Sequence, residues 1–159
     1  MGTGSIAIPA PGQKRNRGRK VAMIGAGSWG TTFAKVLSDA GCDVTILARR
    51  PEQAQEIQVA KRNSQYLPGI NLPKTLQATS DPAVALRGAE LVFLAVPSQT
   101  LRENLLALEP HLHPRAVLVS LVKGVEKSTT MRMSEVIADT LDLDASRIGV
   151  VSGPNIALE

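Results

Sequence analysis

Three glycines, Gly25, Gly27 and Gly30, have the spacing G-x-G-x-x-G within the stretch AMIGAGSWGTTFAKVL. A short apolar run of buried-strand type precedes them, and a helical pattern follows them. In this context the first glycine allows a tight turn, the second lets the backbone approach a pyrophosphate, and the third lets helix and strand pack closely. The free N–H groups at the start of the helix would then receive the diphosphate. The spacing therefore predicts a dinucleotide-binding turn; the alternative is that the glycines serve tight packing alone.

Two arginines follow the second apolar strand of the same unit, in the stretch ILARR. Ala48 stands near the position where an acidic side chain would bind the ribose 2′-hydroxyl of NAD. The guanidinium groups of Arg49 and Arg50 suit a 2′-phosphate instead, because they can bind phosphate through paired hydrogen bonds. We therefore expect NADP as the cofactor, with NAD as the second candidate. The alternatives are that these arginines are only solvated, or that one of them stacks on adenine.

The elements that must position these residues alternate along the chain. Strand patterns occur at residues 20–25, 43–47, 75–79, 89–97, 115–124 and 147–154. Helical patterns occur at residues 28–41, 51–63, 81–88, 98–112 and 128–141, with Gly41 as a C-terminal cap and Asp81 as an N-terminal cap. Strands that alternate with helices indicate βαβ units and a parallel sheet. The sequence thus predicts the α/β class, with a doubly wound, mostly parallel sheet of the Rossmann type.

The chain of 159 residues is long enough for one ordinary domain with an apolar core, but hardly for two. Its net charge of +4 is concentrated near the start, where residues 1–20 contain five Lys or Arg and no acid. Subtracting these five from the 18 basic residues leaves 13 against 14 acidic residues. We therefore predict a flexible basic tail over residues 1–19 and a dinucleotide-binding domain over residues 20–159. The domain is not expected to bind nucleic acid. Contact of the tail with RNA or a membrane is the alternative to a solubilising tail.

Three further features of the sequence argue against an internal disulfide, membrane insertion and a metal site. Cys42 is the only cysteine, so no internal disulfide can form and a reducing cytoplasm is the expected location. No apolar run approaches the roughly 20 residues that span a bilayer, so stable membrane insertion is not expected. His111 and His113 form an H-x-H pair without a supporting cluster of other ligands, so no metal site is expected.

Five motifs follow one another in an order that resembles the bacterial NAD(P)-dependent sn-glycerol-3-phosphate dehydrogenases. They are VAMIGAGSWGTTFAKVL, NSQYLPGINLP, FLAVPSQ, LVKGVE and VSGPNIALE, and together they extend from about residue 20 to the end of the chain. The resemblance implies reversible hydride transfer between dihydroxyacetone phosphate and glycerol 3-phosphate, which supplies phospholipid synthesis. It implies a small phosphorylated substrate as the binding partner, and it is compatible with a homodimer of the full-length protein.

The same resemblance assigns site residues. Cofactor contacts are implied for the glycine turn and for Ser28, Trp29, Arg49, Arg50, Pro97, Lys123 and Ala157. Substrate contacts are implied for Lys123, Gly153 and Asn155. Lys123 also lies at the carboxyl end of a predicted strand, where open α/β sheets bind ligands, and its cation could bind a substrate phosphate or polarise a ketone. Leu158 departs from the family's pattern, in which Lys or Arg is expected, and no role is carried over to that position.

The family's general base is a further lysine in a helical second domain that follows the dinucleotide-binding domain, and we do not find that domain in these 159 residues. No catalytic residue is therefore expected in this chain, and we expect it to bind cofactor with little or no turnover. Two alternatives stay open. One is another dehydrogenase of this architecture, such as a ketopantoate reductase or a hydroxyacid dehydrogenase. The other is a non-catalytic dinucleotide-binding module or redox sensor.

Overall fold

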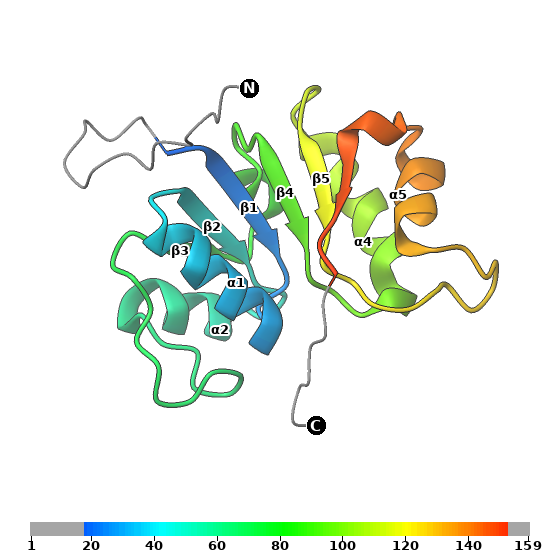
Figure 1. Cartoon of the computed structure of the whole chain (residues 1–159). Coiled ribbons are helices and arrows are strands. Elements are labelled where there is room, and N and C mark those ends of the chain that lie inside the picture. The colour runs from blue at the N-terminus through cyan, green and yellow to red at the C-terminus, as the bar shows by residue number, and fades with distance from the viewer. Residues whose placement is uncertain (1–17, 153–159) are drawn as a thin grey trace, which may run out of the picture.

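A computed structural model describes residues 18–152 of the chain, and its six strands form one sheet (Figure 1). All strand pairs are parallel, and the order across the sheet is β3-β2-β1-β4-β5-β6. The strands are β1 (Lys20–Ile24), β2 (Asp43–Leu47), β3 (Gln77–Thr79), β4 (Leu91–Leu94), β5 (Val117–Ser120) and β6 (Ile148–Val150). The chain proceeds outward from β1 to β3, returns to β4 beside β1, and continues to β6. This order confirms the doubly wound α/β fold.

Helices connect the strands, as parallel pairing requires. They are α1 (Ser28–Asp39), α2 (Pro51–Gln55), α3 (Pro82–Ala85), α4 (Leu101–Leu108) and α5 (Met133–Leu141). A π-helical turn, η1 (Glu56–Ala60), continues α2, and 3-10 turns form η2 (Ser98–Thr100), η3 (Glu109–His111) and η4 (Ala145–Arg147). The predicted N-cap is present, since Asp81 accepts a hydrogen bond from the Ala83 N–H at 2.8 Å. The C-cap of α1 is Ala40 rather than Gly41, which comes directly after it with a φ of 95°. Within the described residues, every helix falls short of the length and apolar character needed to cross a bilayer.

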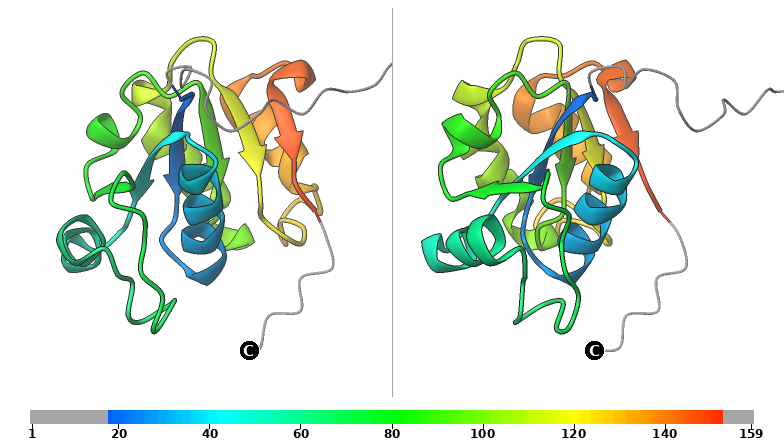
Figure 2. Two further views of the ribbon diagram at one scale, coloured as in Figure 1. Left: turned by 60° about the vertical axis from the view of Figure 1, so that its left-hand side comes forward. Right: turned by 90° about the vertical axis from the view of Figure 1, so that its left-hand side faces the viewer.

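The two faces of the sheet are covered by different helices. Side chains alternate along β1, so that Val21 and Met23 pack in one buried cluster with residues of α1, α2 and η1. Ala22 and Ile24 point to the other face and pack in a second cluster with residues of α4 and α5. Figure 2 shows α1 on the opposite side of the sheet from α4 and α5. Central parallel strands that are apolar on both faces are what this arrangement requires.

The predicted helix over residues 51–63 is too long. The structure ends η1 at Ala60, because Lys61 has a left-handed backbone with a φ of 52°. This conformation is supported from outside the segment, since the Lys61 ammonium donates to the Leu76 carbonyl at 2.6 Å. Asn63 then lies beyond the helix and is fully buried.

The predicted helix over residues 128–141 is also wrong at its start. Residues 121–132 form a loop that is closed by an antiparallel bridge between Val125 and Arg132. The helix α5 begins at Met133, where the Glu135 carboxylate accepts a hydrogen bond from the Arg132 backbone N–H at 2.8 Å. Strands β3 to β6 are likewise shorter than predicted, and residues 153–154 of the last predicted strand lie outside the described residues.

Two of the three glycines are required by the fold itself. Gly25 has a φ of 109°, and a Cβ added there would lie 2.4 Å from the Ala95 carbonyl oxygen at the end of β4. A Cβ on Gly30 would lie 2.3 Å from the Gly25 carbonyl oxygen, so a side chain would push α1 away from β1. Gly27 differs from both, because its φ is −74° and an added Cβ would meet nothing within 4 Å. Neither backbone strain nor internal packing explains the glycine at position 27.

This contrast predicts the stability of two variants. Gly30→Ala should lower the Tm by roughly 4 °C or more, because overpacking against backbone costs about 1–3 kcal/mol. Gly27→Ala should lower it by about 2 °C or less, the effect of a poorer N-cap residue. Thermal unfolding followed by circular dichroism measures both. Equal losses of Tm in the two variants would show that Gly27 is also a packing residue.

Candidate functional site

The segments that carry the predicted site residues converge at the edge where the parallel strands end (Figure 1). Strand β1 leads into the glycine turn and β2 into Arg49 and Arg50. Pro97 follows β4, and Lys123 follows β5. In doubly wound sheets, ligands bind at this edge beside the point where the strand order reverses, which here lies between β1 and β4. The structure thus brings the predicted residues of four loops to one side of the molecule.

The glycine turn has the properties of an anion-binding site. Gly27 is the N-cap of α1, a helix of 12 residues, and no side chain caps the helix. The first turn of α1 contains no acidic residue, so the partial positive charge at this helix end is not neutralised there. The space beside the Gly27 Cα would be filled by any other side chain. A dinucleotide pyrophosphate therefore fits this turn by charge and by room.

Ser28 and Trp29 lie on the first turn of α1 and are exposed. Trp29 is 38% exposed, and its ring packs at a tilt against that of Phe33, with ring centroids 5.6 Å apart. Phe33 in turn contacts Phe93 of β4 at 5.2 Å. The indole is therefore supported from below while one part of it faces solvent, beside the turn.

A buried polar cluster, which residue spacing did not predict, lies beneath the same turn. Gln53 and Asn63 both donate hydrogen bonds to the Ala26 carbonyl, at 2.7 and 2.9 Å. The sequence carried one signal for it, the asparagine that begins the motif NSQYLPGINLP, but a polar residue in that position could equally have been solvated. Its burial depends on how η1 ends, which residue spacing alone does not show.

The arginine pair lies on one side of the glycine turn, at the end of β2. Arg49 and Arg50 are both exposed, and the Arg50 guanidinium donates a hydrogen bond to the Gln65 side chain. A cleft of about 240 Å³ is lined there by Arg50, Glu52, Gln53, Glu56 and Gln65. Hydrogen bonds from the Ser64 side chain and backbone hold the pKa of Glu56 below its ordinary value, so that carboxylate is charged at neutral pH. The cleft therefore contains carboxylates beside the cation, which the sequence analysis had not placed there.

Lys123 lies on the other side of the turn, in a larger cleft of about 380 Å³. The cleft is formed by the ends of β5 and β6 and the start of α5, with Ser120, Arg132, Ser134 and Ser152 as its polar lining. Lys123 is exposed, as is Arg132. The Arg132 guanidinium also donates to the Glu135 carboxylate at 2.7 Å. Two exposed cations, with Ser134 and Ser152 beside them, suit a phosphorylated ligand.

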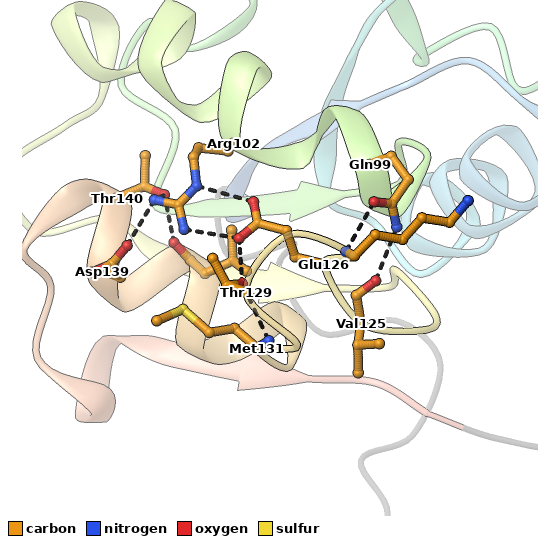
Figure 3. A network of polar contacts seen from close by, with 10 residues as sticks. Gln99, Arg102, Val125, Glu126, Thr129, Met131, Asp139 and Thr140 are labelled. Atoms are coloured by element: carbon orange, nitrogen blue, oxygen red, sulfur yellow. Dashed lines mark hydrogen bonds and ion pairs between the residues drawn. The ribbon is translucent and has the colours of Figure 1, made fainter.

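Figure 3 shows how the loop that carries Lys123 is held in place. The Gln99 amide donates to the Val125 carbonyl at 2.9 Å and accepts from the Lys127 N–H at 3.1 Å. Glu126 is 8% exposed, and its two oxygens accept from the Arg102 Nε and Nη2 atoms at 3.0 and 3.1 Å. The motifs FLAVPSQ and LVKGVE are therefore in direct contact, and η2 and α4 hold the loop after β5.

The Arg102 guanidinium joins this loop to α5 as well. Its Nη1 donates to the Asp139 carboxylate at 2.7 Å and to the Thr140 hydroxyl at 3.1 Å. Hydrogen bonds from Arg102, and next from Thr129, hold the pKa of Glu126 below its ordinary value. The pKa of Arg102 is raised by Glu126 and Asp139. Both partners are therefore charged at neutral pH.

Of four further predicted site residues, one is exposed and three lie outside the described residues. Pro97 is exposed between β4 and η2, at the same edge. Gly153, Asn155 and Ala157 lie outside the described residues. Within residues 18–152, no group of three or more His, Cys, Asp or Glu side chains could hold a metal ion.

The Arg102–Glu126 contact predicts a pH-dependent stability. A glutamate whose pKa is lowered in the folded state stabilises the protein above its ordinary pKa of 4.5, and this stabilisation is lost as the pH falls through the lowered value. Arg102→Met should therefore lower the Tm at pH 7, and the difference in Tm from the wild type should shrink below about pH 4.5. Thermal unfolding between pH 7 and 3 tests this.

Lys35→Met is the matched control, because it removes the exposed Lys35–Asp39 pair of α1. Such exposed pairs contribute about 0–1 kcal/mol, so its Tm should stay near that of the wild type. A Tm difference for Arg102→Met that is the same at every pH would contradict the assignment.

Known proteins resemble this chain in sequence and in structure. The glycerol-3-phosphate dehydrogenase (NAD(P)+) of Leifsonia xyli is 64% identical over 137 residues, which cover 86% of this chain and 37% of that protein. The crystal structure of glycerol-3-phosphate dehydrogenase from Coxiella burnetii is 28% identical, has a TM-score of 0.75, and is matched over 85% of this chain and 40% of its own. A ketopantoate reductase from Ralstonia eutropha, matched over 82% and 39%, has the lower TM-score of 0.56.

These matches decide between the families considered. The chain spans less than half the length of the relatives it matches. The family model described as NAD-dependent glycerol-3-phosphate dehydrogenase N-terminus matches residues 20–159, which contain all five motifs. This chain therefore belongs to the NAD-dependent glycerol-3-phosphate dehydrogenase family and contains its N-terminal region.

Proposed function

We propose that this chain is the cofactor-binding part of an NAD(P)-dependent glycerol-3-phosphate dehydrogenase. The observation that carries the proposal is Gly27, a glycine at an uncapped helix N-terminus with open space where a Cβ would be. A pyrophosphate that approaches the Gly27 backbone explains why this residue is a glycine, whereas backbone strain and internal packing do not. Family membership supplies the identity of the ligand as a nicotinamide dinucleotide.

The proposed reaction is the reversible interconversion of glycerol 3-phosphate and dihydroxyacetone phosphate, which would supply phospholipid synthesis. A bound nicotinamide cofactor supplies or accepts the hydride. The N–H groups at the start of α1 would hold its pyrophosphate, and Arg49 and Arg50 would hold the 2′-phosphate of NADP. Lys123 would contact cofactor and substrate from the loop after β5, where Glu126 and Gln99 fix the backbone. The substrate contacts of Gly153 and Asn155 and the cofactor contact of Ala157 stay sequence-based predictions.

The proton transfer is assigned to the part of the relatives that this chain does not match. General acid–base catalysis contributes roughly 10²–10⁴-fold to such reactions. On this proposal the 159 residues alone bind cofactor but turn over little or no substrate. A location in the reducing cytoplasm and a homodimer of the full-length protein belong to the same proposal.

The cofactor preference can be measured with Trp29, the only tryptophan of the chain. NADPH and NADH should each quench its fluorescence saturably, with the lower Kd for NADPH. Arg50→Met should raise the Kd for NADPH by roughly tenfold, the effect of losing one charge-assisted hydrogen bond. It should raise the Kd for NADH far less.

Arg115→Met is the matched control, because Arg115 is exposed just before β5, at the opposite edge of the sheet. Its binding of both cofactors should be unchanged. Equal affinities of the wild type for NADPH and NADH would contradict the expected preference for NADP. The carboxylates of Glu52 and Glu56 beside Arg50 would then explain the equal affinities, because they repel a 2′-phosphate. Absence of binding to either cofactor would contradict the proposed function.

A further inference from the structure

The carbonyl oxygen of Ala26, in the middle of the glycine turn, is held by two buried amide side chains. Gln53 Nε2 donates to it at 2.7 Å, and Asn63 Nδ2 donates at 2.9 Å. These two bonds occupy both lone pairs of the oxygen. Asn63 is 0% exposed and Gln53 is 9% exposed, so water does not compete for the Asn63 amide.

The remaining hydrogens of the two amide groups are used as well. Asn63 Nδ2 also donates to the hydroxyl of Thr31, a fully buried residue of α1, at 2.8 Å. Gln53 Nε2 also donates to Asn63 Oδ1 at 3.2 Å. We call Gln53, Asn63 and Thr31 the Ala26 clamp. Since an unpaired buried polar group costs free energy, any other arrangement of the clamp is disfavoured, and the direction of the Ala26 carbonyl is fixed.

The direction of this carbonyl determines that of the next backbone donor. In a trans peptide the C=O and the following N–H point in opposite directions, and the described residues contain no cis peptide. The clamp draws the Ala26 C=O into the protein, so the Gly27 N–H points away from the clamp. The open space beside the Gly27 Cα lies at the same residue. The donor and the room for a ligand therefore coincide.

We propose that Asn63 and Gln53 are positioning residues that orient the Gly27 N–H toward the pyrophosphate of the cofactor. The proposal rests on the proposed function, since it assumes that this turn binds a dinucleotide. Asn63 itself is buried and would not touch the cofactor. The proposal gives the first residue of NSQYLPGINLP a role, which the sequence analysis had not assigned. It also couples the loop after η1 to binding at the turn.

The test is the Kd of the 159-residue chain for NADPH and for NADH, measured through Trp29 well below the Tm of each variant. Asn63→Leu keeps the approximate shape of the side chain and removes the two hydrogen bonds that Asn63 Nδ2 donates, to the Ala26 carbonyl and to the Thr31 hydroxyl. It should raise the Kd by roughly tenfold, and by the same factor for both cofactors, because the pyrophosphate is common to them. Arg50→Met, in contrast, should affect mainly NADPH. Equal loss for the two cofactors therefore separates the clamp from the arginine site.

Ser38→Ala is the control for a purely structural effect. Ser38 is a buried polar residue at the other end of α1, paired with the Thr75 hydroxyl at 3.0 Å. The Ser38→Ala variant should have a lower Tm than the wild type and unchanged Kd values for NADPH and NADH. A folded Asn63→Leu variant with wild-type Kd values would overturn the proposal.

If Asn63→Leu does not fold, Thr31→Val decides the question, because it removes one anchor of the Asn63 amide and keeps the shape of the helix. A rise in Kd of roughly threefold for both cofactors supports the proposal, and an unchanged Kd contradicts it. Failure of the wild-type chain to bind either cofactor would contradict the proposed function and this inference together. Wild-type binding with unaffected clamp variants would contradict the inference alone.

Discussion

The close approach of three backbone segments at the glycine turn is the constraint on which the rest of the structure depends. Gly25 lies against the carbonyl at the end of β4, and Gly30 lies against the carbonyl of Gly25. These contacts leave no room for side chains, and they bring the start of α1 directly over the ends of β1 and β4. Because the strand order reverses between these two strands, the helix N-terminus points into the opening where doubly wound sheets bind ligands.

Polar groups on both sides of the turn are held by side chains from other elements. On one side, Gln53 and Asn63 hold the Ala26 carbonyl, and Gln65 holds Arg50. On the other side, Gln99 and Arg102 hold the loop that carries Lys123. A binding site whose exposed groups are supported in this way loses less conformational entropy when a ligand binds. The exposed site residues and their buried supports therefore have to be considered together.

Local patterns predicted the alternation of strands and helices, the sheet class, the tight turn at Gly25 and the close packing at Gly30. They failed where the chain is shaped by distant partners. The helix predicted from residue 128 begins at Met133, because Glu126 and Thr129 are bound into the network of Arg102, which lies on another helix. Asn63 was predicted to be helical, but the left-handed backbone of Lys61 ends the helix before it, and the Asn63 side chain donates to the Ala26 carbonyl instead. Contacts between residues far apart in sequence leave no periodic signal, so neither outcome could be derived from spacing.

On the proposed function, Gly27 is a glycine because a cofactor approaches its backbone. The decisive experiment compares the Kd for NADPH of Gly27→Ala with that of the wild type, on samples whose folding has been confirmed by circular dichroism. The account predicts a well-folded variant that binds NADPH at least roughly tenfold more weakly, since a methyl group would occupy the space for the pyrophosphate. Wild-type affinity in this variant would contradict the account and would place the cofactor elsewhere on the molecule.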